Sequence, residues 1–205
     1  MLSSIHRALP AIEKMKYPEF NIRGFNVPKF EIESGKMVRF WVQIVPDKEN
    51  DQNGYWGVKR IFEIIDNYNN KNYSTKIHLC KNQVSLRLFD FIKPISTKDY
   101  LKNLFGQKST EIISILETFN IKEDYTLRKM GLAHKKILSI ICGIESNEVI
   151  AFDFYGFAPE TEEKLMDYVK IKLKEGKAVI GFDNLGYKEE QLENTQIDNQ
   201  IIKRI

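Results

Sequence analysis

The sequence EVIAFDFYGFAPETEEKLMDYVKIKLKEGKAVIGFDN, residues 148–184, contains the pattern that is most informative about the fold. Residues 148–157 are an apolar run, which is typical of a strand buried inside a parallel sheet. Residues 159–176 have apolar side chains at helical spacing, with a proline at the start and a glycine at the end. Residues 177–184 form a second buried-strand pattern. A strand, a helix and a strand in this order predict a βαβ crossover, and therefore an α/β protein with parallel strand pairing.

The sequence before this unit predicts a helical region. Residues 135–144 are apolar on nearly every side, which indicates a buried helix. Two shorter helices are predicted at residues 97–106 and 109–120. We therefore expect a helical subdomain, about residues 86–130, inserted in the α/β core.

The N-terminal part of the chain favours β structure. Aromatic and β-branched residues predominate between residues 20 and 45, where they predict a small antiparallel β part. The strands are predicted at residues 20–25, 29–34 and 36–45. A helix at residues 56–68 and a short strand at 76–82 should follow.

Composition excludes several classes of protein. The chain has 205 residues, of which 42% are hydrophobic and 29% charged, as in ordinary globular domains. The net charge of +3 comes from interleaved acidic and basic residues, so we expect no nucleic-acid partner. No apolar run approaches the ~18 residues of a membrane span, so direct membrane insertion is not expected. The N-terminus lacks the apolar core of a secretory signal, which favours a cytoplasmic location.

The potential metal-binding residues are too dispersed to indicate a metal site. Cys80 and Cys142 both lie in apolar surroundings, which is typical of reduced structural thiols. The three histidines are scattered, with no acidic or thiol partner at metal-ligand spacing.

The order and spacing of residues 131–184 resemble the second half of the nucleotide-binding subunit of ABC transporters. In that family a signature of the type LSGGQ opens a buried helix, and an apolar strand ending in Asp-Glu follows. A short loop, a helix, a last strand and a histidine come next. The resemblance extends more weakly over residues 20–185 and implies one ABC-ATPase-like α/β domain with a mostly parallel sheet. Residues 1–19 would be an N-terminal extension, and residues 186–205 a polar tail that forms one terminal helix or frays.

The phosphate-binding loop of that family, Walker A, has no counterpart in this sequence. GxxxxGK[ST] is required because glycines let backbone N–H groups surround the phosphates, while lysine and a hydroxyl bind phosphate and Mg²⁺. Residues 53–60, NGYWGVKR, retain Asn53, Gly54, Gly57 and Lys59 but place aromatic side chains in the loop. An alternative alignment puts Lys48 at the lysine position. Both alignments predict weak or absent phosphate binding.

The residues that perform hydrolysis in that family also differ. The strand that should end in Asp-Glu ends in Asp153 and Phe154, and a phenyl ring cannot accept a proton from water. Asp153 either lies near a metal or caps the turn that follows. The switch histidine corresponds to Asp183 or Asn184.

The signature and Q-loop motifs are degraded as well. The signature aligns with residues 129–133, where Met130 replaces the serine and Gly131 is the only glycine that remains. The Q-loop glutamine aligns with Asn82 or Gln83. The resemblance thus implies a vestigial nucleotide site formed by Asn53, Gly54, Gly57, Lys59, Asn82, Gly131, Asp153 and Asp183.

Retention of the apolar pattern with loss of all these motifs suggests a catalytically degenerate cassette. Such a pseudo-ATPase would have no catalytic residue, no metal site and no cofactor, with ATP and Mg²⁺ bound weakly at most. It would act as a structural or regulatory subunit of an ABC transporter, with a membrane permease or a second cassette as partner, at the cytoplasmic face of the inner membrane. Two alternatives stay open: a weak ATP-binding ATPase completed by a partner, or a soluble protein-interaction module unrelated to transport.

Overall fold

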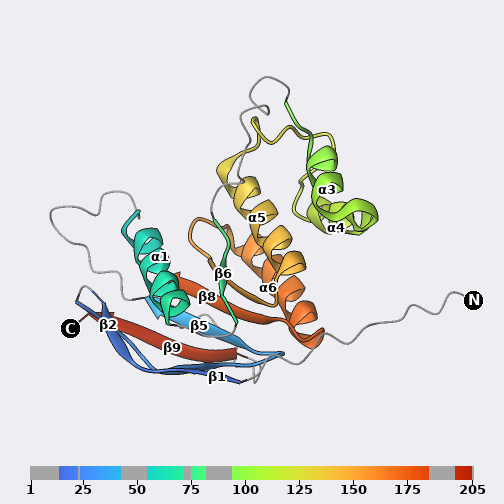
Figure 1. The fold of residues 1–205 in the computed structure, drawn as a ribbon. Coiled ribbons are helices and arrows are strands. Elements are labelled where there is room, and N and C mark those ends of the chain that lie inside the picture. The colour runs from blue at the N-terminus through green and yellow to red at the C-terminus, as the bar shows by residue number, and fades with distance from the viewer. Residues whose placement is uncertain are drawn as a thin grey trace, which may run out of the picture.

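The structure is a computed structural model that describes residues 14–22, 24–42, 55–71, 75–81, 94–184 and 197–204. Its centre is a seven-stranded mixed sheet in the order β2–β3–β9–β5–β8–β7–β6 (Figure 1). These strands are β2 (Phe20–Ile22), β3 (Phe25–Val27), β5 (Met37–Val42), β6 (His78–Leu79), β7 (Val149–Asp153), β8 (Ala178–Asn184) and β9 (Ile197–Arg204). The five strands from β9 to β6 are parallel, and β2 and β3 add an antiparallel edge.

A second, two-stranded antiparallel sheet is formed by β1 (Met15–Tyr17) and β4 (Phe30–Ile32). Both predictions for the sheet, the mostly parallel core and the small N-terminal antiparallel part, are confirmed. The prediction of one strand at residues 20–25 is wrong. The segment is a hairpin, because Gly24, with φ of 80°, reverses the chain between β2 and β3.

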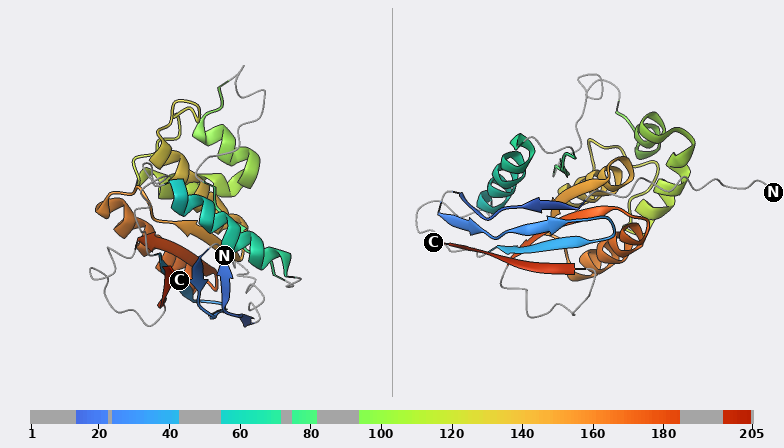
Figure 2. Two further views of the ribbon diagram at one scale, coloured as in Figure 1. Left: turned by 90° about the vertical axis from the view of Figure 1, so that its left-hand side faces the viewer. Right: turned by 60° about the horizontal axis from the view of Figure 1, so that its bottom comes forward.

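The helices are α1 (Tyr55–Asn70), α3 (Thr97–Phe105), the short 3₁₀ helix η1 (Gly106–Lys108), α4 (Ser109–Glu117), α5 (Leu132–Ser146) and α6 (Pro159–Lys174). Local capping explains two of their limits. The Ser96 hydroxyl accepts a hydrogen bond from the Asp99 N–H at 3.1 Å, which starts α3. α6 begins with Pro159, whose missing N–H is not needed at that position. The lobe of α3 and α4 lies at the opposite end of the molecule from β1 and β2 (Figures 1 and 2).

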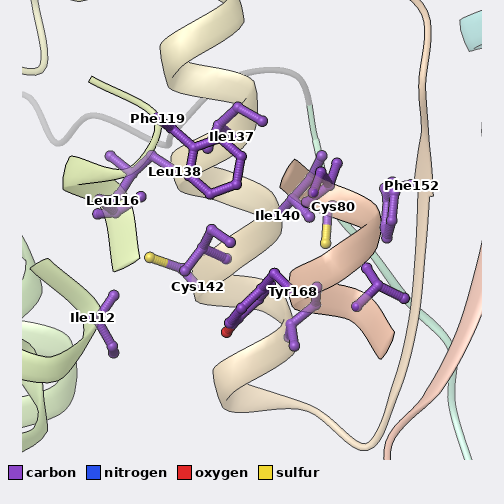
Figure 3. Packing of buried hydrophobic residues seen from close by; sticks show 14 of the residues in the cluster. Cys80, Ile112, Leu116, Phe119, Ile137, Leu138, Ile140, Cys142, Phe152 and Tyr168 are labelled. Carbon is purple, nitrogen blue, oxygen red and sulfur yellow. The ribbon is translucent and has the colours of Figure 1, made fainter. Parts of the chain in front are cut away.

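Each face of the sheet is covered by its own group of helices. Ile61, Ile64 and Ile65 of α1 pack with Phe40 of β5 and Phe182 of β8, together with side chains of β1, β3 and β4. On the other face, α5 packs against β7 and α6 against β8, while α4 packs on α5. Figure 3 shows this cluster, which includes Ile112, Leu116, Ile137, Leu138, Ile140, Phe152 and Tyr168. Successive side chains of a strand point to opposite faces of the sheet, so alternate residues of one strand belong to different cores.

The two cysteines, Cys142 of α5 and Cys80 directly after β6, belong to the same core cluster. Both thiols are free and buried, as the sequence predicted. Burial raises the pKa of Cys142 to about 12 and shifts that of Cys80 upward as well, so both remain protonated and unreactive.

Gly143 of α5 allows the helix to approach β6 closely. A Cβ atom at this position would lie 2.4 Å from Cys80 Sγ. We expect Gly143→Ala to lower the free energy of unfolding by about 1–3 kcal/mol through overpacking, which outweighs the gain in helix propensity. Urea unfolding measures the loss. It should become much smaller in the Cys80→Ala background, and an equal loss in both backgrounds would contradict the explanation.

The prediction for residues 186–205 is wrong in its secondary structure. Ile197–Arg204 is neither a helix nor frayed but strand β9, parallel to β5 and antiparallel to β3. β9 therefore joins the N-terminal β part to the parallel core. The sheet includes residues beyond 185, and β1 begins before residue 20.

Candidate functional site

The candidate site lies where the carboxyl ends of β5, β8 and β7 meet. These three strands are adjacent and parallel, so their ends are at the same edge of the sheet. After β5 the chain leads through α1 to β6 on one side, whereas after β8 it returns past β5 to β9 on the other. In open α/β sheets, ligands bind outside the carboxyl ends of neighbouring strands whose connections leave in opposite directions.

Arg39 of β5 forms the first charged cluster in this region. Its side chain is 1% exposed and donates hydrogen bonds to Asp183 Oδ2 of β8 and, at 2.5 Å, to Glu162 Oε1 of α6. The guanidinium carbon lies 4.4 Å from the ring centroid of Trp41 and 4.3 Å from that of Phe154. A guanidinium between two aromatic faces gains cation–π stabilisation in addition to its ion pairs.

Lys136 of α5 forms the second cluster. Its ammonium donates to Asp153 Oδ1 at the end of β7 and to the Tyr155 carbonyl at 2.7 Å. It also lies 4.7 Å from the ring centroid of Phe157. The N–H of Tyr155 donates to Asp153 Oδ1 at 3.1 Å. Asp153 therefore caps the turn after β7, which was one of the two alternatives that the sequence left open.

Burial makes the two members of this pair dependent on each other. The Asp153 side chain is 5% exposed and the Lys136 side chain 8%. Burial raises the pKa of Asp153 and lowers the pKa of Lys136, in each case toward the neutral form. The charge of each residue opposes this effect of burial on the pKa of the other.

Phe154 occupies the position that follows Asp153. Its backbone N–H donates to the Phe182 carbonyl at 2.9 Å, and its ring is 3% exposed. The ring lies over Gly181 of β8, where an added Cβ would be 2.8 Å from Phe154 Cε2. An apolar side chain thus fills the space beside Asp153, and it has no atom that accepts a proton.

No protein-family model and no curated protein sequence matches the chain. Solved structures do match. One is a protein from Pyrococcus furiosus described as the ATP-binding protein of an ABC transporter, with 14% identity over 93% of this chain and 95% of that chain and a TM-score of 0.58. The ATP-binding subunit of another ABC transporter has 14% identity, covers 84% of this chain and 79% of its own, and has a TM-score of 0.53. A nucleotide-free cassette of an ABC transporter has 12% identity, 85% and 81% coverage and a TM-score of 0.52.

The chain has the fold of an ABC ATPase cassette. Of the residues that the resemblance aligned with the phosphate loop, Asn53 and Gly54 belong to residues 43–54, which lie outside the described residues. Gly57 and Lys59 are in α1, but the positions of their side chains are not described, and Asn82 also lies outside the described residues. Whether these residues form a phosphate site stays a prediction.

The structure does position the other three predicted residues of the cassette. It brings Asp153 and Asp183 together, because β7 and β8 are neighbours and Asp153 pairs with Phe182. Gly131 is exposed and precedes the first turn of α5, whose later residue Lys136 enters the site. Asp153 and Asp183 therefore share one edge of the sheet, and each is paired with a basic side chain.

The two basic residues of the site are not among the residues that the sequence predicted. Arg39 lies within the apolar run of β5, and Lys136 precedes the apolar run of α5. For Arg39, a single basic residue among apolar neighbours is a usable signal, because such residues are almost never buried unless paired. Lys136 follows Lys135 in the sequence and gives no such signal. The signal indicates burial with a partner, but it does not identify that partner.

Proposed function

We propose that this chain is a cassette-like protein that does not hydrolyse ATP and that acts as a structural or regulatory subunit of an ABC transporter. The observation that carries the proposal is the buried Phe154 ring at the position where the resemblance implies the glutamate that activates water. For hydrolysis, the residue at this position must accept the proton of the attacking water. The adjacent carboxylate of Asp153 is engaged by the Lys136 ammonium and the Tyr155 N–H.

The Arg39 cluster supports the same proposal. Asp183 corresponds to the switch histidine in one alignment, and its carboxylate accepts a hydrogen bond from Arg39. A carboxylate that is paired with a buried guanidinium cannot donate a hydrogen bond to a phosphate, and it does not attract the negative charge of the phosphate. The polar groups of this edge thus hold one another in place, which suits a structural role.

The proposed partner is a membrane permease or a second, hydrolytically active cassette. Two of the similar structures are described as ATP-binding components of ABC transporters, and that description motivates the choice of partner. No helix within the described ranges is both long and apolar enough to cross a bilayer. The cassette would therefore contribute to transport by docking on a permease.

Turnover of Mg-ATP by the purified full chain tests the proposal. We expect a rate at least about 100-fold below the ~10 s⁻¹ that is typical of enzymes. A hydrolytically active ABC cassette, assayed in parallel, serves as the positive control. Turnover at an ordinary enzymatic rate that is lost in Asp153→Asn would contradict the proposal.

A further inference from the structure

The charged groups around Asp153 do not fit the Mg²⁺ ion that the resemblance implies. Mg²⁺ requires near-octahedral oxygen coordination. Among the described residues there is no group of three or more His, Cys, Asp or Glu side chains that could hold a metal. Asp153 Oδ1 instead accepts hydrogen bonds from a lysine ammonium and a backbone N–H.

We infer that the Lys136 ammonium is the resident cation of this site and that it excludes a divalent metal ion from Asp153. The inference rests on the proposed function. In a cassette that binds neither nucleotide nor metal, the Lys136 ammonium would balance the charge of the Asp153 carboxylate. Lys136 is the specificity-determining residue: its charge decides which cation the carboxylate accepts.

The geometry around the ammonium carries the inference. Lys136 Nζ has three protons to direct, and it has the Asp153 carboxylate, the Tyr155 carbonyl and the face of the Phe157 ring around it. The ammonium is also part of a side chain of α5, so it is present beside Asp153 at every concentration of metal. A divalent ion would have to displace this buried ammonium and leave it near a second positive charge, which is unfavourable at low dielectric.

The second carboxylate of the site is no more available as a ligand. Asp183 is paired with Arg39, and the Phe154 ring lies against the same guanidinium. A metal ion at Asp153 would thus have an ammonium and apolar side chains beside it, in place of the several oxygen ligands that it needs.

A consequence for the cassette follows from the position of Lys136. The residue is on α5, the helix that packs against α4 of the lobe, and Asp153 is on the core strand β7. The ion pair therefore attaches α5 to the core directly. Contact between these two parts does not depend on a bound nucleotide or its metal.

Binding of Mn²⁺ to the full chain tests the inference, with the electron paramagnetic resonance signal of free Mn²⁺ as readout. We expect the wild-type chain to leave the signal of free Mn²⁺ unchanged up to millimolar concentration. Lys136→Met, which removes the charge but keeps an unbranched apolar side chain, frees the Asp153 carboxylate and the Tyr155 carbonyl, so it should show weak Mn²⁺ binding in the millimolar range, where the wild type shows none. Lys136→Met/Asp153→Asn should lose this binding. Lys135→Met, at the neighbouring half-buried lysine, should behave like the wild type.

Labelling of lysines by reductive methylation supplies a test that needs no variant. In the folded wild-type chain Lys136 should stay unmethylated with and without Mn²⁺, while Lys135 is modified. Three results would overturn the inference: wild-type binding of Mn²⁺ that Asp153→Asn abolishes, methylation of Lys136 on addition of Mn²⁺, or a folded Lys136→Met chain that binds no Mn²⁺. The first of these, without ATP turnover, would leave the proposed function intact, so the two failures are distinguishable.

Discussion

Glu145→Gln is expected to lower the free energy of unfolding by about 3–5 kcal/mol, the usual cost of removing one member of a buried ion pair. The Glu145 side chain at the end of α5 is 2% exposed, and its carboxylate contacts basic groups of two other elements. Lys108 of η1 lies 2.5 Å from Oε2, and Lys172 of α6 lies 2.8 Å from Oε1. The Tyr168 hydroxyl also donates to Oε1. Glutamine keeps the shape but leaves the Lys172 ammonium, whose side chain is 8% exposed, without this charge.

The same carboxylate makes acid sensitivity a second readout for this substitution. Burial alone would raise the pKa of Glu145, but hydrogen bonds from Lys108, Lys172 and Tyr168 outweigh it and hold the pKa at about 2. Because the folded pKa is below the ordinary value of 4.5, this stabilisation is complete above about pH 4.5 and is lost as the pH falls to about 2. Urea unfolding should therefore show a gap between the wild type and Glu145→Gln that narrows over this range. Glu117→Gln, at an exposed residue of α4, is the matched control, and a gap that is independent of pH would contradict the assignment.

The predictable part of the fold consists of the segments whose burial is complete. β7 is buried along its whole length, so its apolar run predicts a central strand without any knowledge of its neighbours. β9 is the opposite case. Ile197–Arg204 reads IDNQIIKR and has several exposed or half-buried side chains, although its backbone pairs with strands on both sides. Backbone hydrogen bonds place this strand in the sheet, and they leave no mark in the side-chain pattern.

The residues of the site also differ in how far the sequence predicts them. Asp153 and Asp183 could be predicted from the resemblance, which aligns both with functional positions at the ends of strands, and the parallel pairing of β7 and β8 brings these ends together. Their basic partners could not. Arg39 is 144 residues from Asp183 in sequence and meets it because β5 lies beside β8, a neighbour relation that is set by sheet order. Local pattern contains no information on that order.

The pairing of Arg39 also gives the other large expected effect, because Arg39→Met removes the buried guanidinium that pairs with the Asp183 carboxylate. The Asp183 side chain is 4% exposed, so we expect the free energy of unfolding to fall by about 3–5 kcal/mol in urea. Arg39→Lys should recover only part of the loss, since an ammonium does not reproduce the planar contact with Trp41 and Phe154.

The double variant Arg39→Met/Asp183→Asn separates the charge of Arg39 from its packing. If the lost countercharge at the Asp183 carboxylate causes most of the loss, removal of the Asp183 charge should make the double variant more stable than Arg39→Met alone, in spite of the second substitution. If the stacked guanidinium matters chiefly through its contacts with the aromatic rings, the two losses should simply add. Additive losses would contradict the electrostatic explanation, because the charge of Asp183 would then contribute nothing to the loss of stability in Arg39→Met.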